Sequence, residues 1–256
     1  MIYETHAHYD DRDYDEDRQK VLEAVCAAGV GRIVNVAASM RSCITTLELS
    51  RQYADIYAAV GVHPSETGEL TDEDMILLES YCKMDKVLAV GEIGLDYYWD
   101  EPERDVQKKW FIRQLELARK VKLPVIIHSR DAAADTLDIM KNQHAEDIGG
   151  VIHCFSYETE MAREYLNMGY YLGVGGVVTF KNGRKLKEVV EYAPIDRIVL
   201  ETDSPYLSPV PYRGKRNSSA NIPLIIEEIA ALKGMTAEAV EEITWQNALR
   251  LYRQES

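Results

Sequence analysis

The segment Pro124-Val125-Ile126-Ile127-His128 is a short apolar run that ends in one polar side chain, a histidine. Residues 87–90, Val-Leu-Ala-Val, form a second apolar run. Near-continuous runs of this kind are typical of parallel strands that helices cover on both faces. Similar segments recur roughly every 20 to 35 residues, which is the spacing of repeated strand–helix units. The predicted strands are residues 2–5, 32–36, 56–61, 87–93, 124–128, 150–154, 170–174 and 197–201.

The segments between these strands have helical periodicity. Phe111, Leu115 and Ala118 recur at positions i, i+4 and i+7, and Thr71 before three acidic residues resembles a capped helix start. Eight strands alternating with helices predict an α/β protein with a (β/α)₈ TIM barrel, and a doubly wound open sheet is the alternative. The length of 256 residues suits one barrel domain over residues 1–256. A long loop rich in Pro, Gly, Ser and Asn follows the eighth strand, over residues 204–223.

The charge balance limits the kinds of partner. The chain has 43 Asp and Glu against 29 Lys and Arg, a formal net charge of −14. An acidic protein does not coat nucleic acid through a broad basic surface. Contact with nucleic acid should therefore be local, at the ends of nucleic-acid strands. The cysteines have no zinc-finger or redox spacing, and no signal peptide or membrane-length apolar run is visible. We therefore expect a cytoplasmic protein with no membrane partner and no evident obligate protein partner.

Ionisable side chains gather at the predicted strand ends. In a barrel the carboxyl ends of all strands meet at one rim, which is where such enzymes place their active sites. The residues at these positions are His6, His8, His63, Glu92, His128, His153 and Asp203. His6 and His8 lie two apart on one strand, so their side chains face the same way. Burying so many ionisable groups together without a cation is costly, so the pattern predicts a metal site.

At this point the motifs resemble those of a known family, the TatD-type metal-dependent deoxyribonucleases, which belong to the amidohydrolase-like TIM barrels. The resemblance covers almost the whole chain, from residue 2 to about residue 250, and the motifs occur in the family's order. The matching segments are His6-Ala7-His8, Gly61-Val62-His63-Pro64, Gly91-Glu92-Ile93-Gly94-Leu95-Asp96-Tyr97, Pro124-Val125 to His128-Ser129-Arg130, His153-Cys154-Phe155-Ser156, Glu201-Thr202-Asp203-Ser204-Pro205-Tyr206 and Arg213-Gly214-Lys215-Arg216-Asn217.

The resemblance implies two divalent metal ions per subunit, and it leaves Mg, Mn and Zn open. It implies that His6, His8 and Asp203 hold one ion, that His128 and His153 hold the second, and that Glu92 bridges the two. A water activated between the ions would be the nucleophile, with Asp203 as the general base. The implied catalytic residues are therefore Asp203, Glu92 and His63.

Four residues are candidates for substrate contact, and each has an alternative. His63 would contact the scissile phosphate or the leaving oxygen, or else cap its strand. Arg130 and Arg213 would clamp phosphate groups, or else stay solvated at the surface. Tyr97 would stack on a base, or else pack against the barrel rim.

Two positions depart from the family pattern. Glu4 stands where the family usually has Asp, and Ser218-Ser219 follow Asn217 where the family typically has a proline. Because Glu4 precedes the candidate ligands, we expect it to change their orientation rather than to remove a metal. We expect the second departure to loosen the loop after the eighth strand.

The residues and the resemblance together predict a metal-dependent phosphodiester hydrolase. The expected activity is 3′→5′ exonucleolytic cleavage of single-stranded DNA, with RNA as a further substrate. The same activated water could instead attack a carbonyl, as in a D-aminoacyl-tRNA deacylase that hydrolyses a carboxylic ester. A third alternative is a non-catalytic, metal-binding scaffold.

Overall fold

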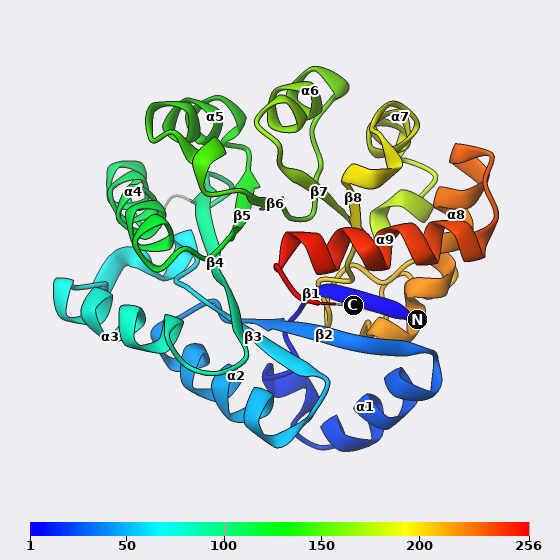
Figure 1. Cartoon of the computed structure of the whole chain (residues 1–256), viewed down its shortest axis with the longest axis horizontal. Helices are drawn as coiled ribbons and strands as arrows, with labels where there is room; N and C mark the ends of the chain where they lie inside the picture. Colours follow the sequence, from blue (N-terminus) through cyan, green and yellow to red (C-terminus); the bar gives the residue numbers. More distant parts are fainter. Residues whose placement is uncertain (100, 256) are drawn as a thin grey trace.

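The fold is a closed ring of parallel strands surrounded by helices (Figure 1). It is seen in a computed structural model that describes residues 1–99 and 101–255. Within these residues, eight strands pair in the order in which they occur along the chain. They are β1 (Ile2–Ala7), β2 (Val30–Val36), β3 (Ile56–Val60), β4 (Val87–Asp96), β5 (Val125–Arg130), β6 (Gly150–Ile152), β7 (Tyr171–Val174) and β8 (Ile198–Leu200).

The sheet closes between its first and last strands. Ala7 and Ser204 form a parallel bridge, and the Asp203 amide donates a hydrogen bond of 3.0 Å to the His6 carbonyl. The Thr5 hydroxyl also donates to the Leu200 carbonyl at 2.9 Å. The predicted (β/α)₈ barrel is therefore confirmed, and the doubly wound open sheet is wrong, because such a sheet has a reversal in strand order and two free edges.

The predicted strand positions are confirmed, but the lengths of some strands differ. β4 continues to Asp96, three residues beyond its predicted end, because Gly94, Leu95 and Asp96 remain paired with residues 128–130 of β5. The prediction ended where the apolar pattern ended, whereas the backbone ladder continues through residues that serve the site. Glu92 consequently lies within β4 rather than at its end.

The helices form the outer layer of the barrel (Figure 1). The capped start predicted at Thr71 is confirmed, since its side chain and that of Asp74 form a reciprocal capping box at the start of α3. The helices are α1 (Arg18–Ala27), α2 (Met40–Gln52), α3 (Asp72–Cys82), α4 (Arg104–Val121), α5 (Ala133–Asn142), α6 (Thr159–Asn167), α7 (Arg184–Tyr192), α8 (Ile222–Lys233) and α9 (Ala237–Leu251). Short 3₁₀ helices are η1 (Arg12–Tyr14), η2 (Pro64–Glu69), η3 (Ala145–Asp147), η4 (Gly176–Thr179), η5 (Ile195–Arg197) and η6 (Ser219–Asn221).

The strands carry two separate apolar clusters on their two faces. Along β5, for example, Val125 and Ile127 belong to the layer under the helices, whereas Ile126 belongs to a smaller cluster with residues of the other strands. This smaller cluster also contains Trp245 and Leu249 of α9. α9 therefore closes the end of the barrel where the strands begin, near both chain termini (Figure 1). The opposite end, where the strands finish, is left for the site.

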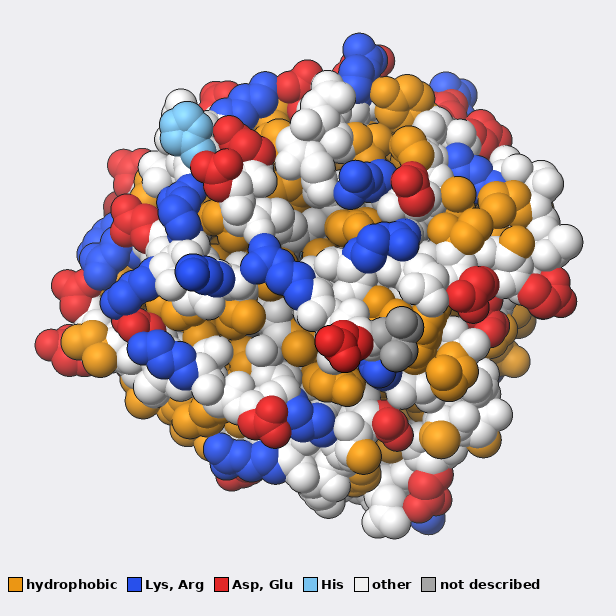
Figure 2. All heavy atoms as spheres, viewed as in Figure 1, with side chains coloured by type: hydrophobic (Ala, Val, Ile, Leu, Met, Phe, Trp, Pro, Cys, Tyr) orange, Lys and Arg blue, Asp and Glu red, His pale blue; other side chains and the backbone are white. Residues whose placement is uncertain are grey.

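The surface has the mixed charge that the composition predicts. On the face that shows α9, Lys and Arg side chains are interspersed with Asp and Glu, and no broad basic surface is visible from this side (Figure 2). None of the helices in the described part of the chain is long and apolar enough to cross a membrane. The cytoplasmic location stays a prediction.

Candidate metal centre

The carboxylate of Glu92 lies at the centre of a cluster of imidazole rings. Its Oε2 atom faces Nε2 of His6 at 3.4 Å and Nε2 of His8 at 3.8 Å. Its Oε1 atom faces Nδ1 of His128 at 2.6 Å and Nε2 of His153 at 2.8 Å. The two oxygens of one carboxylate thus face two different pairs of histidines, which is the arrangement that a bridging ligand requires.

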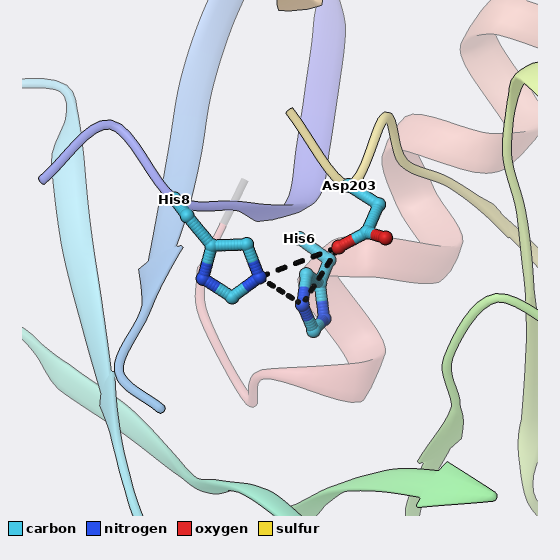
Figure 3. Close-up of side chains that lie close together, drawn as sticks. All are labelled: His6, His8 and Asp203. Carbon is cyan, nitrogen blue, oxygen red and sulfur yellow. Dashed lines mark hydrogen bonds and ion pairs between the residues drawn. The ribbon is translucent and has the colours of Figure 1, made fainter. Parts of the chain in front are cut away.

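The first group of candidate ligands consists of His6, His8 and Asp203 (Figure 3). The Nε2 atoms of the two histidines face each other at 3.2 Å, and Oδ1 of Asp203 lies 3.3 Å from His8 and 3.7 Å from His6. β1 and the residue after it supply the histidines, and the loop after β8 supplies the acid. Two imidazole nitrogens and a carboxylate oxygen that converge in this way fit the donor set of a divalent transition metal.

The second group consists of His63, Glu92 and His128, whose ligand atoms also lie within 4.8 Å of one another. His153 adjoins this group through Oε1 of Glu92. His63 was predicted to contact substrate, and the structure places its Nε2 atom 3.8 Å from Glu92. Its Nδ1 atom faces the Ser65 hydroxyl at 2.8 Å, so the same side chain also caps η2. The capping role and a role in the site are therefore compatible.

Asp96 is a residue of the site to which the sequence assigned no role. Its Oδ2 atom lies 3.0 Å from Nε2 of His128, on the side of the ring away from Glu92. This contact fixes the ring so that Nδ1 faces the centre, as carboxylates behind histidine ligands commonly do. The signal was present, since Asp96 lies four residues after Glu92 on one strand and an even spacing favours the same face.

Glu201 is a second such residue. It is 1% exposed, accepts a hydrogen bond from the Cys154 amide, and lies 3.7 Å from Nδ1 of His153. Gly173 leaves space for it, because a Cβ atom at that position would collide with the Glu201 carboxylate. Burial raises the pKa of Glu201 to about 8. The Glu201 carboxylate also forms a third group of possible ligands with His6 and His153, and all three residues are buried.

The histidines of the centre differ in their affinity for protons. Burial acts to lower the pKa of His8, but the neighbouring Asp203 and Glu92 carboxylates outweigh it and raise that pKa to about 10. Asp96 and Glu92 similarly raise the pKa of His128 to about 9 against the effect of burial. By contrast, burial and a neighbouring histidine lower the pKa of His6 to about 4 and that of His63 to about 3.

We predict that a divalent ion displaces protons from this centre. His8 and His128 have pKa values above neutrality and hold protons at pH 7, whereas a coordinating imidazole must be neutral. Metal affinity should therefore fall as the pH falls, and binding should release protons. Calorimetric titration in two buffers with different ionisation enthalpies measures the number released. The exposed His144→Asn variant is the control and should release as many as the wild type, and a buffer-independent heat would contradict the prediction.

The two departures from the family pattern meet behind the centre. Glu4 is fully buried, and its Oε1 accepts hydrogen bonds from the amides of His6 and Thr202, each at 3.0 Å. Its Oε2 accepts from the Thr202 hydroxyl at 2.6 Å and from the Ser219 hydroxyl at 2.7 Å. Burial raises the pKa of Glu4 to about 7, although these four donors act in the opposite direction. Glu4 thus joins the backbone at one candidate ligand, His6, to the backbone at Thr202, which precedes another candidate ligand, Asp203.

Removal of this carboxylate should destabilise the protein. We predict that Glu4→Ala lowers the free energy of unfolding by roughly 3 kcal/mol, because it leaves buried donors without acceptors and opens a cavity. Urea denaturation of the metal-free protein measures the change. Glu48→Ala, which alters an exposed side chain of α2, should change it by less than about 0.5 kcal/mol. A loss below about 1 kcal/mol for Glu4→Ala would show that the network contributes little.

Apart from His63, the residues predicted to contact substrate make their contacts outside the imidazole cluster. The Arg130 guanidinium lies over the Tyr98 ring at 3.8 Å, and that of Arg213 lies over Phe180 at 4.4 Å. The Tyr97 hydroxyl donates to Asp135 at 2.6 Å, which holds its ring. Tyr98 and Trp99, in contrast, are more than half exposed and pack edge to face. Roles for Arg130, Arg213 and Tyr97 in substrate binding stay predictions.

A cavity of about 730 Å³ opens directly from the centre, between the loops that follow β1, β2 and β8. Volumes of this size accommodate a small-molecule ligand. One side of the cavity is formed by centre residues, and the other by residues that sequence analysis did not single out. The lining residues are His8, Asp10, Asp11, Arg12, Asp15, Val36, Ala38, Ser39, Arg41, Ser42, Thr45, His63, Glu92, His128, His153, Asp203 and Tyr206.

A (β/α)₈ barrel with histidines and carboxylates gathered at the carboxyl ends of its strands defines the class of metal-dependent barrel hydrolases. Comparison with known proteins agrees. The family described as TatD related DNase matches residues 3–253. The chain is 45% identical to the uncharacterized metal-dependent hydrolase YabD of Bacillus subtilis, over 99% of both chains. It is 36% identical to the uncharacterized metal-dependent hydrolase YcfH of Escherichia coli K12, over 98% of this chain and 96% of that one.

Solved structures give the same result. The crystal structure of YjjV, a TatD homologue from Escherichia coli K12, has a TM-score of 0.94 at 29% identity and covers 99% of this chain and 98% of its own. A hydrolase of the TatD family from Entamoeba histolytica has a TM-score of 0.89 at 24% identity, over 98% and 97% of the two chains, and this likeness concerns the fold alone. The chain belongs to the TatD family of metal-dependent hydrolases.

Proposed function

We propose that the protein is a phosphodiesterase with two divalent ions that removes nucleotides from single-stranded DNA in the 3′→5′ direction. The observation that carries this proposal is the position of Glu92, whose two oxygens face His6 and His8 on one side and His128 and His153 on the other. A site for one ion would not require the two oxygens of the Glu92 carboxylate to face two separate pairs of histidines. The family description as a DNase supports the choice of nucleic acid as substrate.

The donor set assigns a role to each side chain. His6, His8 and Asp203 would hold one ion, His128 and His153 the other, and Glu92 both, with His63 close enough to join the second set. When bound, two such ions supply an acidified water and neutralise charge on the phosphoryl oxygens. Asp203 would orient the attacking water and accept its proton, because its carboxylate lies at the edge of the cavity and its lowered pKa keeps it deprotonated before the reaction.

The residues behind the centre keep these groups in place. Asp96 holds the ring of His128, and Glu4 holds the backbone of His6 and Thr202. His63 has a strongly lowered pKa, so it is neutral at pH 7 and can accept a hydrogen bond or bind an ion. The cavity beside His8 provides space for one substituent of the phosphodiester.

We predict that Glu92→Gln lowers kcat for hydrolysis of single-stranded DNA by roughly a hundredfold or more, because an amide bridges two cations poorly. It should also lower the amount of metal that copurifies with the protein. DNA labelled at its 5′ end measures both rate and polarity, since 3′→5′ removal shortens the labelled strand stepwise. The control is Glu227→Gln on the exposed side of α8, which should retain full activity.

The same preparations decide between the proposed function and its alternative. Each is incubated with D-aminoacyl-tRNA under the same divalent ion. Release of the amino acid without release of nucleotides would replace the nuclease with an ester hydrolase that uses the same centre. Absence of hydrolysis of either substrate with Mg, Mn and Zn would contradict the proposal altogether.

A further inference from the structure

The cavity beside the centre is lined by two arginines, Arg12 and Arg41, as well as by residues of the centre. Arg12 begins η1 in the loop after β1, and Arg41 lies in the first turn of α2, after β2. The two loops are adjacent because β1 and β2 pair. The lining of the cavity therefore combines the imidazoles and carboxylates of the centre with two guanidinium groups from the loops after β1 and β2.

These two arginines differ from a third arginine of the same region. Arg18 is fully engaged, since it donates hydrogen bonds to the carbonyl of Tyr9 at 2.6 Å and to Asp15 at 2.6 Å. Within residues 1–99 and 101–255, neither Arg12 nor Arg41 has a side-chain hydrogen bond or ion pair to the protein. Both are exposed. Arg18 thus serves the fold, whereas Arg12 and Arg41 leave their donors available to a molecule in the cavity.

Acidic residues of the same wall do not compete for these donors, because they have partners of their own. Asp10 accepts hydrogen bonds from the Asn35 amide and the Thr45 hydroxyl, both between 2.8 and 2.9 Å. Asp11 accepts from the amide of Asp13 and from the Tyr206 hydroxyl. Asp15 pairs with Arg18 at 2.6 Å. These carboxylates shape the loops, and Asp10 and Asp11 keep their negative charge because their donors are neutral. The guanidinium donors of Arg12 and Arg41 stay available to a bound molecule.

We propose that Arg12 and Arg41 bind a second phosphate of the substrate, one that neighbours the phosphodiester being cleaved. The proposal rests on the proposed phosphodiesterase function, because the scissile phosphate must lie at the centre. The cavity is large enough for a group beyond that phosphate. A guanidinium group is the side chain best suited to a phosphate, which it can bind through two parallel hydrogen bonds. The site therefore selects substrates with at least two phosphates, such as nucleic acids, over simple diesters.

The experiment compares substrates that differ only in a neighbouring phosphate. They are bis(p-nitrophenyl) phosphate, a thymidine dinucleotide without terminal phosphate, and the same dinucleotide with a 5′ or a 3′ phosphate. The variants are Arg12→Ala, Arg41→Ala, the double variant and each Arg→Lys. The control is Arg51→Ala, at the opposite end of α2 from Arg41. Circular dichroism and metal content show that each variant is folded and loaded.

For one of the two phosphorylated dinucleotides, each alanine variant should lower kcat/KM about tenfold or more, mainly through KM. Hydrolysis of bis(p-nitrophenyl) phosphate should stay within about twofold of the wild type. Lysine should restore part of the loss, since it keeps the charge without the fork of donors. Equal losses on all substrates, or no loss on any, would overturn the proposal and leave the two arginines a structural or purely solvated role.

A binding measurement separates this inference from the proposed function. Fluorescence anisotropy of a labelled single-stranded tetranucleotide with charged, non-hydrolysable linkages is followed with the metal-loaded protein, so that the centre keeps its ions and the strand is not cut. Loss of one phosphate contact should reduce the slope of log K against log salt by about 0.7 for each arginine. An unchanged slope overturns the two-arginine site even if the protein is a nuclease. A reduced slope supports it even if the wild type cleaves no DNA, and absence of any binding by a wild type that cleaves DNA also overturns it.

Discussion

The buried carboxylate of Glu92 is the constraint around which the site is built. It is 4% exposed, and burial alone would raise its pKa, yet His153 and His128 hold that pKa well below its usual value. A buried charge is tolerated only where opposite charge and hydrogen-bond donors meet it closely. The chain must therefore place imidazoles from β1, β5 and the segment after β6 within a few ångströms of one side chain. A closed barrel does this, because its strand ends converge on one rim.

Closure has a second consequence, since it brings the two ends of the sequence together. Thr5 of β1 bonds to Leu200 at the end of β8, and His6 and Ala7 pair with Asp203 and Ser204, which follow β8. These contacts bring Asp203 to His6 and His8. α9 then covers the interior of the barrel at the other end, where Trp245 packs against Tyr3 with ring centroids 5.5 Å apart. The apolar cluster that contains Tyr3 and Trp245 and the polar centre thus lie at opposite ends of the barrel.

The sequence was sufficient for the fold, and it placed the candidate ligands at the strand ends that the structure brings together, because both leave periodic signals. Apolar runs that end in His128 or precede His153 identify the strands and their polar ends together. The spacing from Glu92 indicated the face of β4 on which Asp96 lies but not its role, and it gave no sign of Glu201. Both roles depend on which imidazole nitrogen the carboxylate meets, which spacing does not encode. The sequence also did not single out Arg12 and Arg41. An exposed arginine near a helix start leaves no recognisable pattern in the sequence, and the two residues come together only once the loops after β1 and β2 are placed in the fold.

Glu4 and Ser219 show how far a departure can be interpreted once the contacts are known. From the sequence they were separate changes, and a looser loop was expected at Ser219. In the structure the Ser219 hydroxyl donates to Glu4 at 2.7 Å, and the Ser219 amide donates to the Tyr9 hydroxyl oxygen at 2.8 Å. A proline at this position would have neither the hydroxyl nor the amide hydrogen. A shorter aspartate would in turn have less reach toward Ser219. The two departures are therefore complementary, and together they tie the loop after β8 to the backbone that carries His6.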